Sequence, residues 1–136
     1  MPRYMLDTNI VIYIRASRPA SVLRRLRELG PGDAVMSAIS YGELRFGAEK
    51  SSKRDVDLPL LEALAETIPV QPLSVGAGQT YGRLRLFLSR RGEMIGPNDL
   101  WIAAHALASD STLVTNNERE FRRVPDLRIE NWASAA

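Results

Sequence analysis

Short apolar runs alternate with longer segments of helical periodicity along almost the whole chain. An apolar run too short for a helix is typical of a buried strand, and strands that alternate with helices form parallel βαβ units. The runs expected to be strands are residues 4–6, 34–36, 70–71, 112–115 and, at an edge, 128–132. The alternation therefore predicts an α/β protein built around a short parallel sheet.

The segments between these runs have apolar residues at helical spacing. One expected helix begins at Pro19 and is ended by residues 30–32. The other expected helices cover residues 10–15, 40–50, 58–68, 79–90 and 98–109. Glycine and proline clusters such as Gly30-Pro31-Gly32 end helices, and Gly92 is expected to do the same. With 136 residues the chain is expected to form one domain, residues 1–136, with a frayed tail at 133–136.

The residue types present restrict the chemistry. The chain has no Cys and one His, which excludes disulfides and thiolate zinc sites and argues against an imidazole metal site. His105 is expected to be a packed or surface residue. No signal-peptide pattern or long apolar span occurs, which predicts a cytoplasmic protein without a membrane partner. Sixteen of the eighteen basic residues are Arg, which suits phosphate contacts but also suits plain surface charge.

An aspartate follows the first apolar run directly. Asp7 could be the N-cap of the next helix, but Thr8 and Asn9 could cap it equally well. In open α/β sheets ligands bind at the carboxyl ends of the strands. Asp7 therefore has a second possible role at that edge.

A glutamate between two glycines follows the second apolar run. Ser40 and Glu43 have the spacing of a capping box, which would explain this acid structurally. Gly42 and Gly47 remain unexplained, because each costs about 1 kcal/mol relative to Ala inside a helix. Their presence on either side of Glu43 indicates that another molecule approaches the helix closely there.

Three further acidic residues lie near the remaining strands. Asp99 follows Asn98, which could cap that helix in its place, and Glu118 and Glu120 follow the last core strand, where they could be first-turn helix acids. A parallel sheet would bring these acids to one edge, where they would repel one another or bind a cation. Oxygen ligands favour Mg²⁺ or Mn²⁺, ions that activate water and assist phosphoryl transfer.

Four segments of the chain resemble the PIN-domain toxins of the VapC family, in the family's order. They are residues 5–9 (MLDTN), 37–48 (SAISYGELRFGA), 96–103 (GPNDLWIA) and 113–125 (LVTNNEREFRRVP). The resemblance implies a three-layer α/β/α sandwich and a Mg²⁺-dependent endoribonuclease. It also implies an RNA substrate, expected to be a tRNA anticodon loop, a cognate VapB antitoxin and a homodimer.

The resemblance also assigns roles to single residues. It implies that Asp7 and Asp99 are the principal metal ligands and that Glu43 is the third acid. The family's fourth acid often falls where this chain has Asn117, a departure that puts a second metal ion in question. Glu120, one helical turn further on, is the candidate to replace that acid. The polar residues expected to orient the carboxylates and metal-bound water are Thr8, Asn9, Asn98, Thr115, Asn116 and Asn117.

Two other functions fit parts of the same pattern. A phosphatase or nucleotide hydrolase should show a phosphate-binding glycine loop, which is missing, and residues 76–78 lack the remaining glycine of a dinucleotide fingerprint. A non-catalytic RNA-binding or protein-interaction module stays open as the alternative. A nuclease assay with and without divalent cation separates it from an enzyme.

Overall fold

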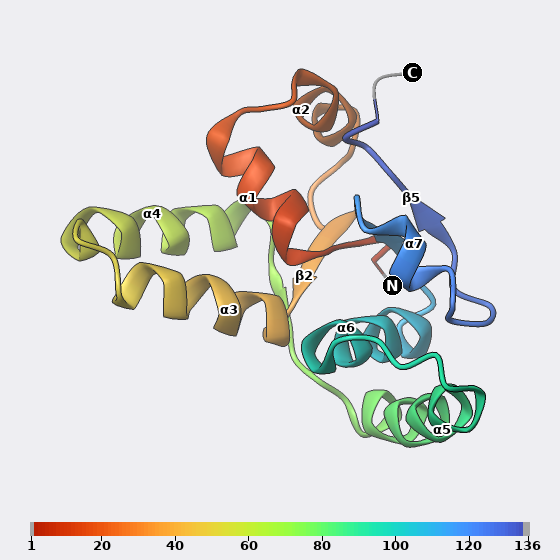
Figure 1. Cartoon of the computed structure of the whole chain (residues 1–136). Helices are drawn as coiled ribbons and strands as arrows, with labels where there is room; N and C mark the ends of the chain where they lie inside the picture. Colours follow the sequence, from red (N-terminus) through yellow and green to blue (C-terminus); the bar gives the residue numbers. More distant parts are fainter. Residues whose placement is uncertain (1, 135–136) are drawn as a thin grey trace.

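The computed structural model, which describes residues 2–134, contains a five-stranded sheet in which every strand is parallel to its neighbours (Figure 1). The strand order is β3-β2-β1-β4-β5, with β1 in the centre. The strands are β1 (Tyr4–Leu6), β2 (Ala34–Ser37), β3 (Val70–Gln71), β4 (Thr112–Val114) and β5 (Ile129–Glu130). All five strands therefore end at the same edge of the sheet, as the sequence predicted.

Seven helices connect the strands of this described part. They are α1 (Thr8–Ala16), α2 (Ala20–Arg27), α3 (Ala38–Glu49), α4 (Arg54–Thr67), α5 (Val75–Arg91), α6 (Pro97–Ala108) and α7 (Glu118–Phe121). In Figure 1 α3 and α4 lie side by side and project away from the sheet, while α5 and α6 form a second pair below it. None of the helices within residues 2–134 is long and apolar enough to cross a membrane.

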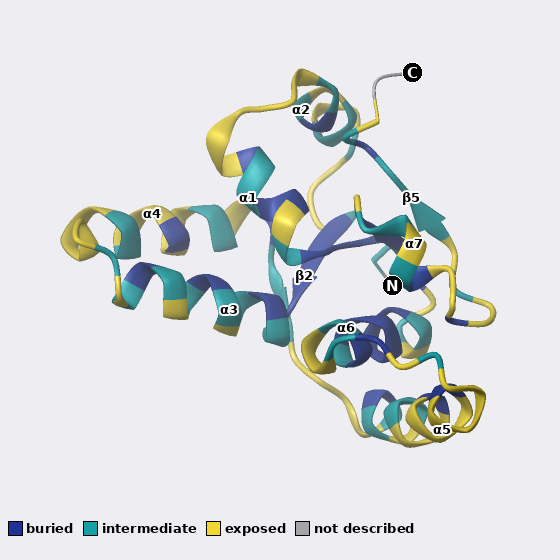
Figure 2. Ribbon diagram, in the orientation of Figure 1, coloured by how far each residue is buried: buried dark blue, intermediate teal, exposed yellow. Residues whose placement is uncertain are grey.

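Helices cover both faces of the sheet. Tyr4 and Leu6 point to one face, where they pack with buried residues of α1 to α4, whereas Met5 points to the other face and packs with α5 and α6. Strands that are buried on both faces are typical of a parallel sheet between two helical layers. Figure 2 shows β2 as buried, and β1 is fully buried too, whereas the edge strands β3 and β5 are only partly buried. The expected three-layer α/β/α arrangement is confirmed.

The strands agree closely with the sequence prediction, except at one edge. β1 has the expected bounds, and β2 and β4 each differ from them by one residue. The last strand is wrong in extent: only residues 129 and 130 pair with β4, not 128–132. Beyond Glu130 the chain turns, because Asn131 accepts a hydrogen bond from the backbone of Ala133 and Trp132 is buried.

Most helices begin earlier than predicted, because the capping residues precede the expected ones. Asp7, Ser37 and Ser74 cap α1, α3 and α5, so these helices start two to four residues before the predicted positions. α4 likewise starts at Arg54 and includes Pro59, whereas a start at residue 58 was expected. Gly92 ends α5 with φ 65°, as predicted. Of the expected frayed tail, residues 135 and 136 lie outside the described residues.

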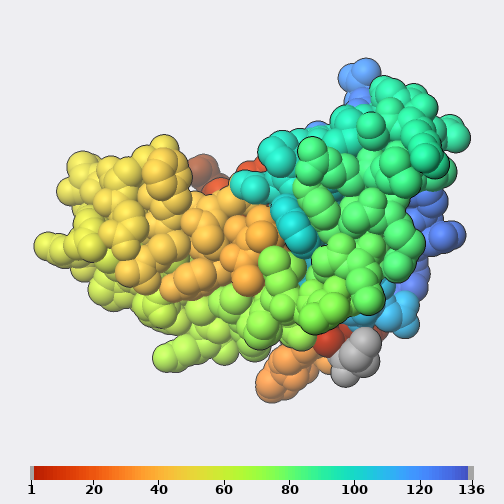
Figure 3. All heavy atoms as spheres, turned by 90° about the horizontal axis from the view of Figure 1, so that it is seen from below, coloured from red at the N-terminus to blue at the C-terminus, as the bar shows by residue number. Residues whose placement is uncertain are grey.

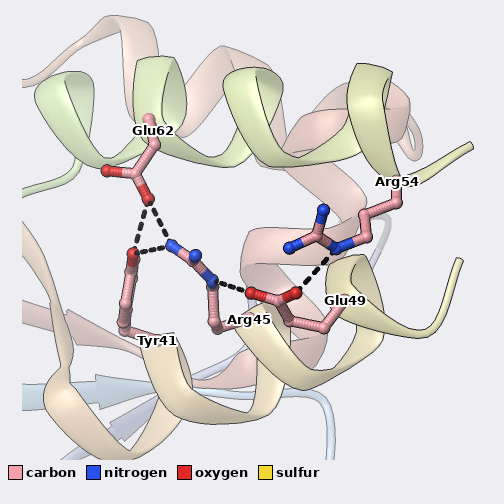
Figure 4. Close-up of polar contacts among 5 residues, drawn as sticks. All are labelled: Tyr41, Arg45, Glu49, Arg54 and Glu62. Atoms are coloured by element: carbon pink, nitrogen blue, oxygen red, sulfur yellow. Dashed lines mark hydrogen bonds and ion pairs between the residues drawn. The ribbon is translucent and has the colours of Figure 1, made fainter.

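A network of side chains holds α3 beside α4 (Figure 4). The Arg45 guanidinium donates to Glu49 at 2.8 Å and to Glu62 at 3.3 Å, and Glu49 also accepts from Arg54 at 2.8 Å. Tyr41 donates to the same Glu62 oxygen at 2.5 Å. Exposed ion pairs contribute little singly, but a network restrains geometry. This network therefore determines which side of α3 faces α4.

Candidate active site

Asp7 lies at the carboxyl end of the central strand and is 5% exposed. Its Oδ1 accepts a hydrogen bond from the backbone N–H of Ile10 at 3.0 Å, so it is the N-cap of α1. Its Oδ2 accepts a hydrogen bond from the hydroxyl of Thr115, which follows the neighbouring strand. The capping interpretation and the site interpretation are thus compatible, because the two oxygens of one carboxylate serve different partners.

Thr115 and Asn117 connect Asp7 to a second acid. The Thr115 hydroxyl donates to Asp7 and accepts from the backbone N–H of Asn117 at 2.9 Å. The Asn117 side-chain amide donates to Glu120 Oε2 at 2.9 Å, and the Gly96 N–H donates to Glu120 Oε1 at 2.7 Å. The loop after β4 therefore joins the central strand, α7 and the start of α6.

Glu43 does not cap its helix. The predicted capping box is wrong, because α3 begins at Ala38 with Ser37 as its cap, which places Glu43 in the second turn. The Ser40 hydroxyl is buried and has no hydrogen-bond partner within residues 2–134. Glu43 instead accepts a hydrogen bond from the Thr8 hydroxyl at 2.6 Å. Capping therefore does not explain why the chain has an acid at Glu43.

Asp99 lies in the first turn of α6, beside Glu120. The N-cap of α6 is Gly96, so neither Asn98 nor Asp99 is the capping residue. A Cβ atom on Gly96 would lie 3.6 Å from Asp99 Oδ2 and 3.7 Å from Glu120 Oε1, which shows how closely the two acids approach that backbone. The negative charge of Glu120 therefore acts on Asp99 at close range and disfavours its ionised form.

The pKa values of the two neighbouring acids shift in opposite directions. Burial, together with the charges of Glu120, Asp7 and Glu43, raises the pKa of Asp99 to about 6. Burial acts in the same direction on Glu120, but hydrogen bonds from Gly96 and Asn117 help to lower its pKa overall. A raised pKa beside several acids is typical of a functional site.

Asp7 is perturbed in the same direction. Burial raises its pKa, hydrogen bonds from Thr115, Ile10 and the Asn9 backbone oppose this, and the charge of Glu43 adds to it. The Coulombic effects link Asp7, Glu43, Asp99 and Glu120 into one group. The four acids come from four separate segments of the sequence, and the parallel sheet brings them to one edge.

The chemistry of this group suits a hard divalent cation. All the donors are oxygen atoms, and their mutual repulsion is the condition that a bound cation relieves. Among residues 2–134 no three His, Asp or Glu side chains lie close enough to hold an ion by themselves. Mg²⁺ is commonly held by one or two carboxylates and several waters, so a pair of acids meets its requirement.

The other predicted residues lie at different distances from the acids. Asn98 lines a hollow beside Glu43, and the Asn9 backbone contributes to the stability of the Asp7 carboxylate. The Asn116 side chain donates to the Tyr13 hydroxyl at 2.6 Å and makes no described hydrogen bond to an acid. His105 is buried against Ser37, and burial lowers its pKa.

Phe46 is the residue near this site that the sequence did not single out for a role there. It lines the hollow beside Glu43 and its side chain is 65% exposed. An aromatic residue one turn after the acid on α3 was the available signal, but its exposure could not be predicted.

The sequence of the chain matches known proteins over nearly its whole length. The PIN domain family matches residues 4–127 of the chain. The ribonuclease VapC2 of Rickettsia felis is 40% identical over 130 residues, which cover 95% of this chain and 97% of that protein. The chain belongs to the VapC ribonucleases of the PIN-domain family. The tRNA(fMet)-specific endonuclease VapC of Shigella flexneri is 40% identical over 133 residues, covering 98% of this chain and 100% of that protein.

A solved structure of the VapC family has the same fold. The VapBC-1 structure from nontypeable Haemophilus influenzae superposes with a TM-score of 0.89 and 39% identity, over 96% of this chain and 98% of that one. PIN-domain ribonucleases generally depend on a divalent metal ion. The fold and family implied by the resemblance are therefore confirmed, while the roles of single residues stay predictions.

Proposed function

We propose that this chain is a Mg²⁺-dependent endoribonuclease, the toxin of a toxin–antitoxin pair, that hydrolyses phosphodiester bonds in cytoplasmic RNA. The observation that carries the proposal is the grouping of Asp7, Glu43, Asp99 and Glu120 at the carboxyl edge of the sheet in a member of the VapC family. The similarity to the Shigella protein, whose name gives tRNA(fMet) as its target, supports a tRNA substrate.

In this proposal Asp7 and Asp99 hold the ion, with Mn²⁺ as a possible substitute for Mg²⁺. When bound, the ion polarises a phosphate oxygen and lowers the pKa of water. The Thr115 hydroxyl holds Asp7 Oδ2, and the α1 cap holds Oδ1, so this carboxylate cannot rotate freely. Asp99 must be ionised to bind a cation, and its raised pKa shows that ionisation is disfavoured until a cation offsets the neighbouring charges.

Glu43 and Glu120 are the remaining acids of the proposed machinery. Thr8 orients Glu43 through a 2.6 Å hydrogen bond, and Asn117 and Gly96 orient Glu120. An oriented carboxylate can accept a proton from an attacking water. Glu43, whose carboxylate borders an open hollow, is the better placed of the two to meet a substrate.

The partners proposed are a cognate VapB antitoxin and a second copy of this chain. The Haemophilus structure is named as VapBC-1, and its similarity supports an antitoxin of that kind for this chain. An antitoxin Arg could form a bidentate pair with the acids, because a guanidinium matches carboxylate geometry.

The test is cleavage of bulk RNA by the purified protein with Mg²⁺, with EDTA and with Ca²⁺, followed by sequencing of the new 5′ ends in cells. We expect cleavage with Mg²⁺ only, because Ca²⁺ prefers more ligands at longer distances. Free nucleotides are the control for a general phosphatase. Equal cleavage in EDTA would refute metal dependence, and RNA binding without cleavage would favour the non-catalytic alternative.

A further inference from the structure

A hollow of about 520 Å³ lies next to the proposed active site, on the outer face of α3. It is lined by Ala38, Ile39, Gly42, Glu43, Phe46 and Asn98, so it shares Glu43 with the acid group. In the space-filling view from below, the surface of α3 meets the surface of α5 and α6 along this side of the protein (Figure 3). A substrate bound at the acids would therefore extend into it.

The α3 helix presents Phe46 to solvent on this side. Ser40, Leu44 and Ala48 turn towards the core, and the network in Figure 4 uses the side that faces α4. Phe46 is left 65% exposed, with the Lys50 ammonium 4.9 Å from its ring centre. Contact with water is unfavourable for so large an apolar ring, which is why an exposed aromatic beside a site commonly serves a ligand.

The two glycines of α3 border the same region. A Cβ atom at Gly42 or Gly47 would meet nothing within 4 Å, so the packing of the described chain does not require glycine at either position. Glycine nevertheless weakens a helix interior. Its presence at Gly42, in the wall of the hollow, is explained if a ligand lies against the helix there.

A second hollow, of about 340 Å³, lies on the other side of Glu43. Its lining includes Gly47, Arg15 and Lys50. Asp57 lines it too, but among the described residues neither Arg15 nor Lys50 forms an ion pair with any acid. Neither cation is therefore neutralised by an acid, and Lys50 links the two hollows, because it lines the second one while its ammonium lies over the Phe46 ring of the first. An aromatic ring and two cations beside Glu43 match the two chemical parts of a nucleotide chain.

We propose that a single-stranded RNA crosses α3 at Glu43, with one nucleobase stacked on Phe46 in the first hollow and a neighbouring phosphate beside Lys50 and Arg15 in the second. This inference rests on the proposed ribonuclease function. Stacking on an aromatic face tolerates any base, because every base has a π-face. Phe46 thus positions the strand without selecting its sequence at that nucleotide.

The first experiment compares Phe46→Leu with Phe46→Trp in binding to a short fluorescein-labelled single-stranded RNA. Both variants also carry Asp99→Asn, so that cleavage does not interfere. We expect Phe46→Leu to bind roughly tenfold more weakly and Phe46→Trp to bind as tightly as the parent, because Trp retains the stacking face. In proteins without Asp99→Asn, Phe46→Leu should raise KM by a similar factor and leave kcat nearly unchanged.

The second experiment uses glycine variants whose stability and binding should change in opposite directions. Gly42→Ala should raise the thermal midpoint by roughly a few degrees and yet weaken binding of the same RNA. Gly82→Ala, in α5, is the matched control, because a Cβ there also meets nothing within 4 Å. It should raise the midpoint by a similar amount and leave RNA binding unchanged.

The outcomes separate this inference from the proposed function. Wild-type protein that cleaves RNA, together with a Phe46→Leu variant that binds and cleaves equally well, overturns the inference alone. The inference is also overturned if Phe46→Leu and Gly42→Ala weaken only the complex with the antitoxin. If the wild type does not cleave, the proposed function fails, and RNA binding that still depends on Phe46 and Gly42 supports the strand path independently.

Discussion

The raised pKa of Asp99 makes the stability of the metal-free protein depend on pH. The folded-state pKa of Asp99 is about 6, above its ordinary value of 3.8. Its contribution to stability is therefore fully present below about pH 4 and is lost as the pH rises through about 6. At neutral pH Asp99 is ionised in the folded protein, although burial and the neighbouring acids disfavour its charge. A bound cation would remove this loss of stability.

Replacing Asp99 with Asn should remove both the proposed metal ligand and this pH dependence. In EDTA near pH 8 we expect Asp99→Asn to be more stable than wild type by about 1 to 2 kcal/mol, a value reduced for solvent screening of a half-exposed group. The difference should vanish towards about pH 4, where wild-type Asp99 is protonated. RNA cleavage should be lost at every pH. Thermal melts across this range measure the first effect, and a variant that cleaves RNA fully would contradict the assignment.

Thr115 is a buried hydroxyl whose two hydrogen bonds both serve the site. Thr115→Val has the same shape but neither donates to Asp7 nor accepts from the Asn117 N–H. We expect the free energy of unfolding to fall by about 1 to 3 kcal/mol, because the Asn117 N–H loses its acceptor and Asp7 Oδ2 loses its donor. Metal affinity should fall by about tenfold or more, since Asp7 loses its orienting partner. Calorimetry with Mn²⁺ measures this, and Thr115→Ser should restore the affinity; an unchanged affinity in Thr115→Val would remove Thr115 from the site.

At the scale of elements, the loop between β4 and α7 contains Asn117, at the position where the family resemblance predicts an acid. The Asn117 amide donates to Glu120, which an aspartate could not do. We expect Asn117→Asp to destabilise the metal-free protein by about 1 kcal/mol through repulsion of Glu120, and to bind Mn²⁺ more tightly. Melts in EDTA and calorimetry give the two quantities.

Asn116→Asp is the matched control for this loop. It adds the same charge one residue away, but the Asn116 amide contacts Tyr13 and not Glu120. Tighter Mn²⁺ binding in both variants would show only a general effect of added charge. Unchanged affinity in Asn117→Asp would place this position outside the metal's surroundings.

The strands could be predicted from the sequence more accurately than the helix starts. Tyr4–Leu6 is apolar, bounded by polar residues and too short for a helix, so a buried strand is the natural prediction. Helix starts were ambiguous because several residues in a row can cap. Asp7, Thr8 and Asn9 are all good N-caps, and only the three-dimensional structure shows that Asp7 accepts the hydrogen bond.

The site was predictable as a set of acids but not as a set of contacts. Strand ends and the family resemblance indicated Asp7, Glu43 and Asp99 as members of one group. The sequence could not show that Glu120 reaches the Gly96 backbone, 24 residues away, because this contact depends on how α7 lies beside α6. The raised pKa of Asp99, to which the Glu120 charge contributes, was equally hidden.

At the scale of the whole molecule, burial separates the apolar residues of the core from those that a partner could contact. Leu84 and Leu88 are buried against α6 and belong to the core, whereas Phe46 and Phe87 are exposed, at 65% and 41%. Phe46 borders the proposed active site and Phe87 lies on α5, in a different part of the chain. Of these two exposed rings, Phe46 is therefore the one at which a partner would meet the substrate.

If an antitoxin Arg occupies the acid group, Mg²⁺ and antitoxin should compete. The charges of Asp99 and Glu120 repel each other when no cation is present, so either a guanidinium or Mg²⁺ can relieve their repulsion, but not both at one place. Titration of Mg²⁺ into the preformed complex with the cognate antitoxin should promote dissociation, which light scattering or native gels can follow. A complex made with Asp99→Asn should respond less, because that variant binds the ion poorly while its apolar regions are intact. Antitoxin affinity that is independent of Mg²⁺ in the wild type would exclude direct occupation of the acids, and inhibition would then depend on blocking the hollows on either side of Glu43.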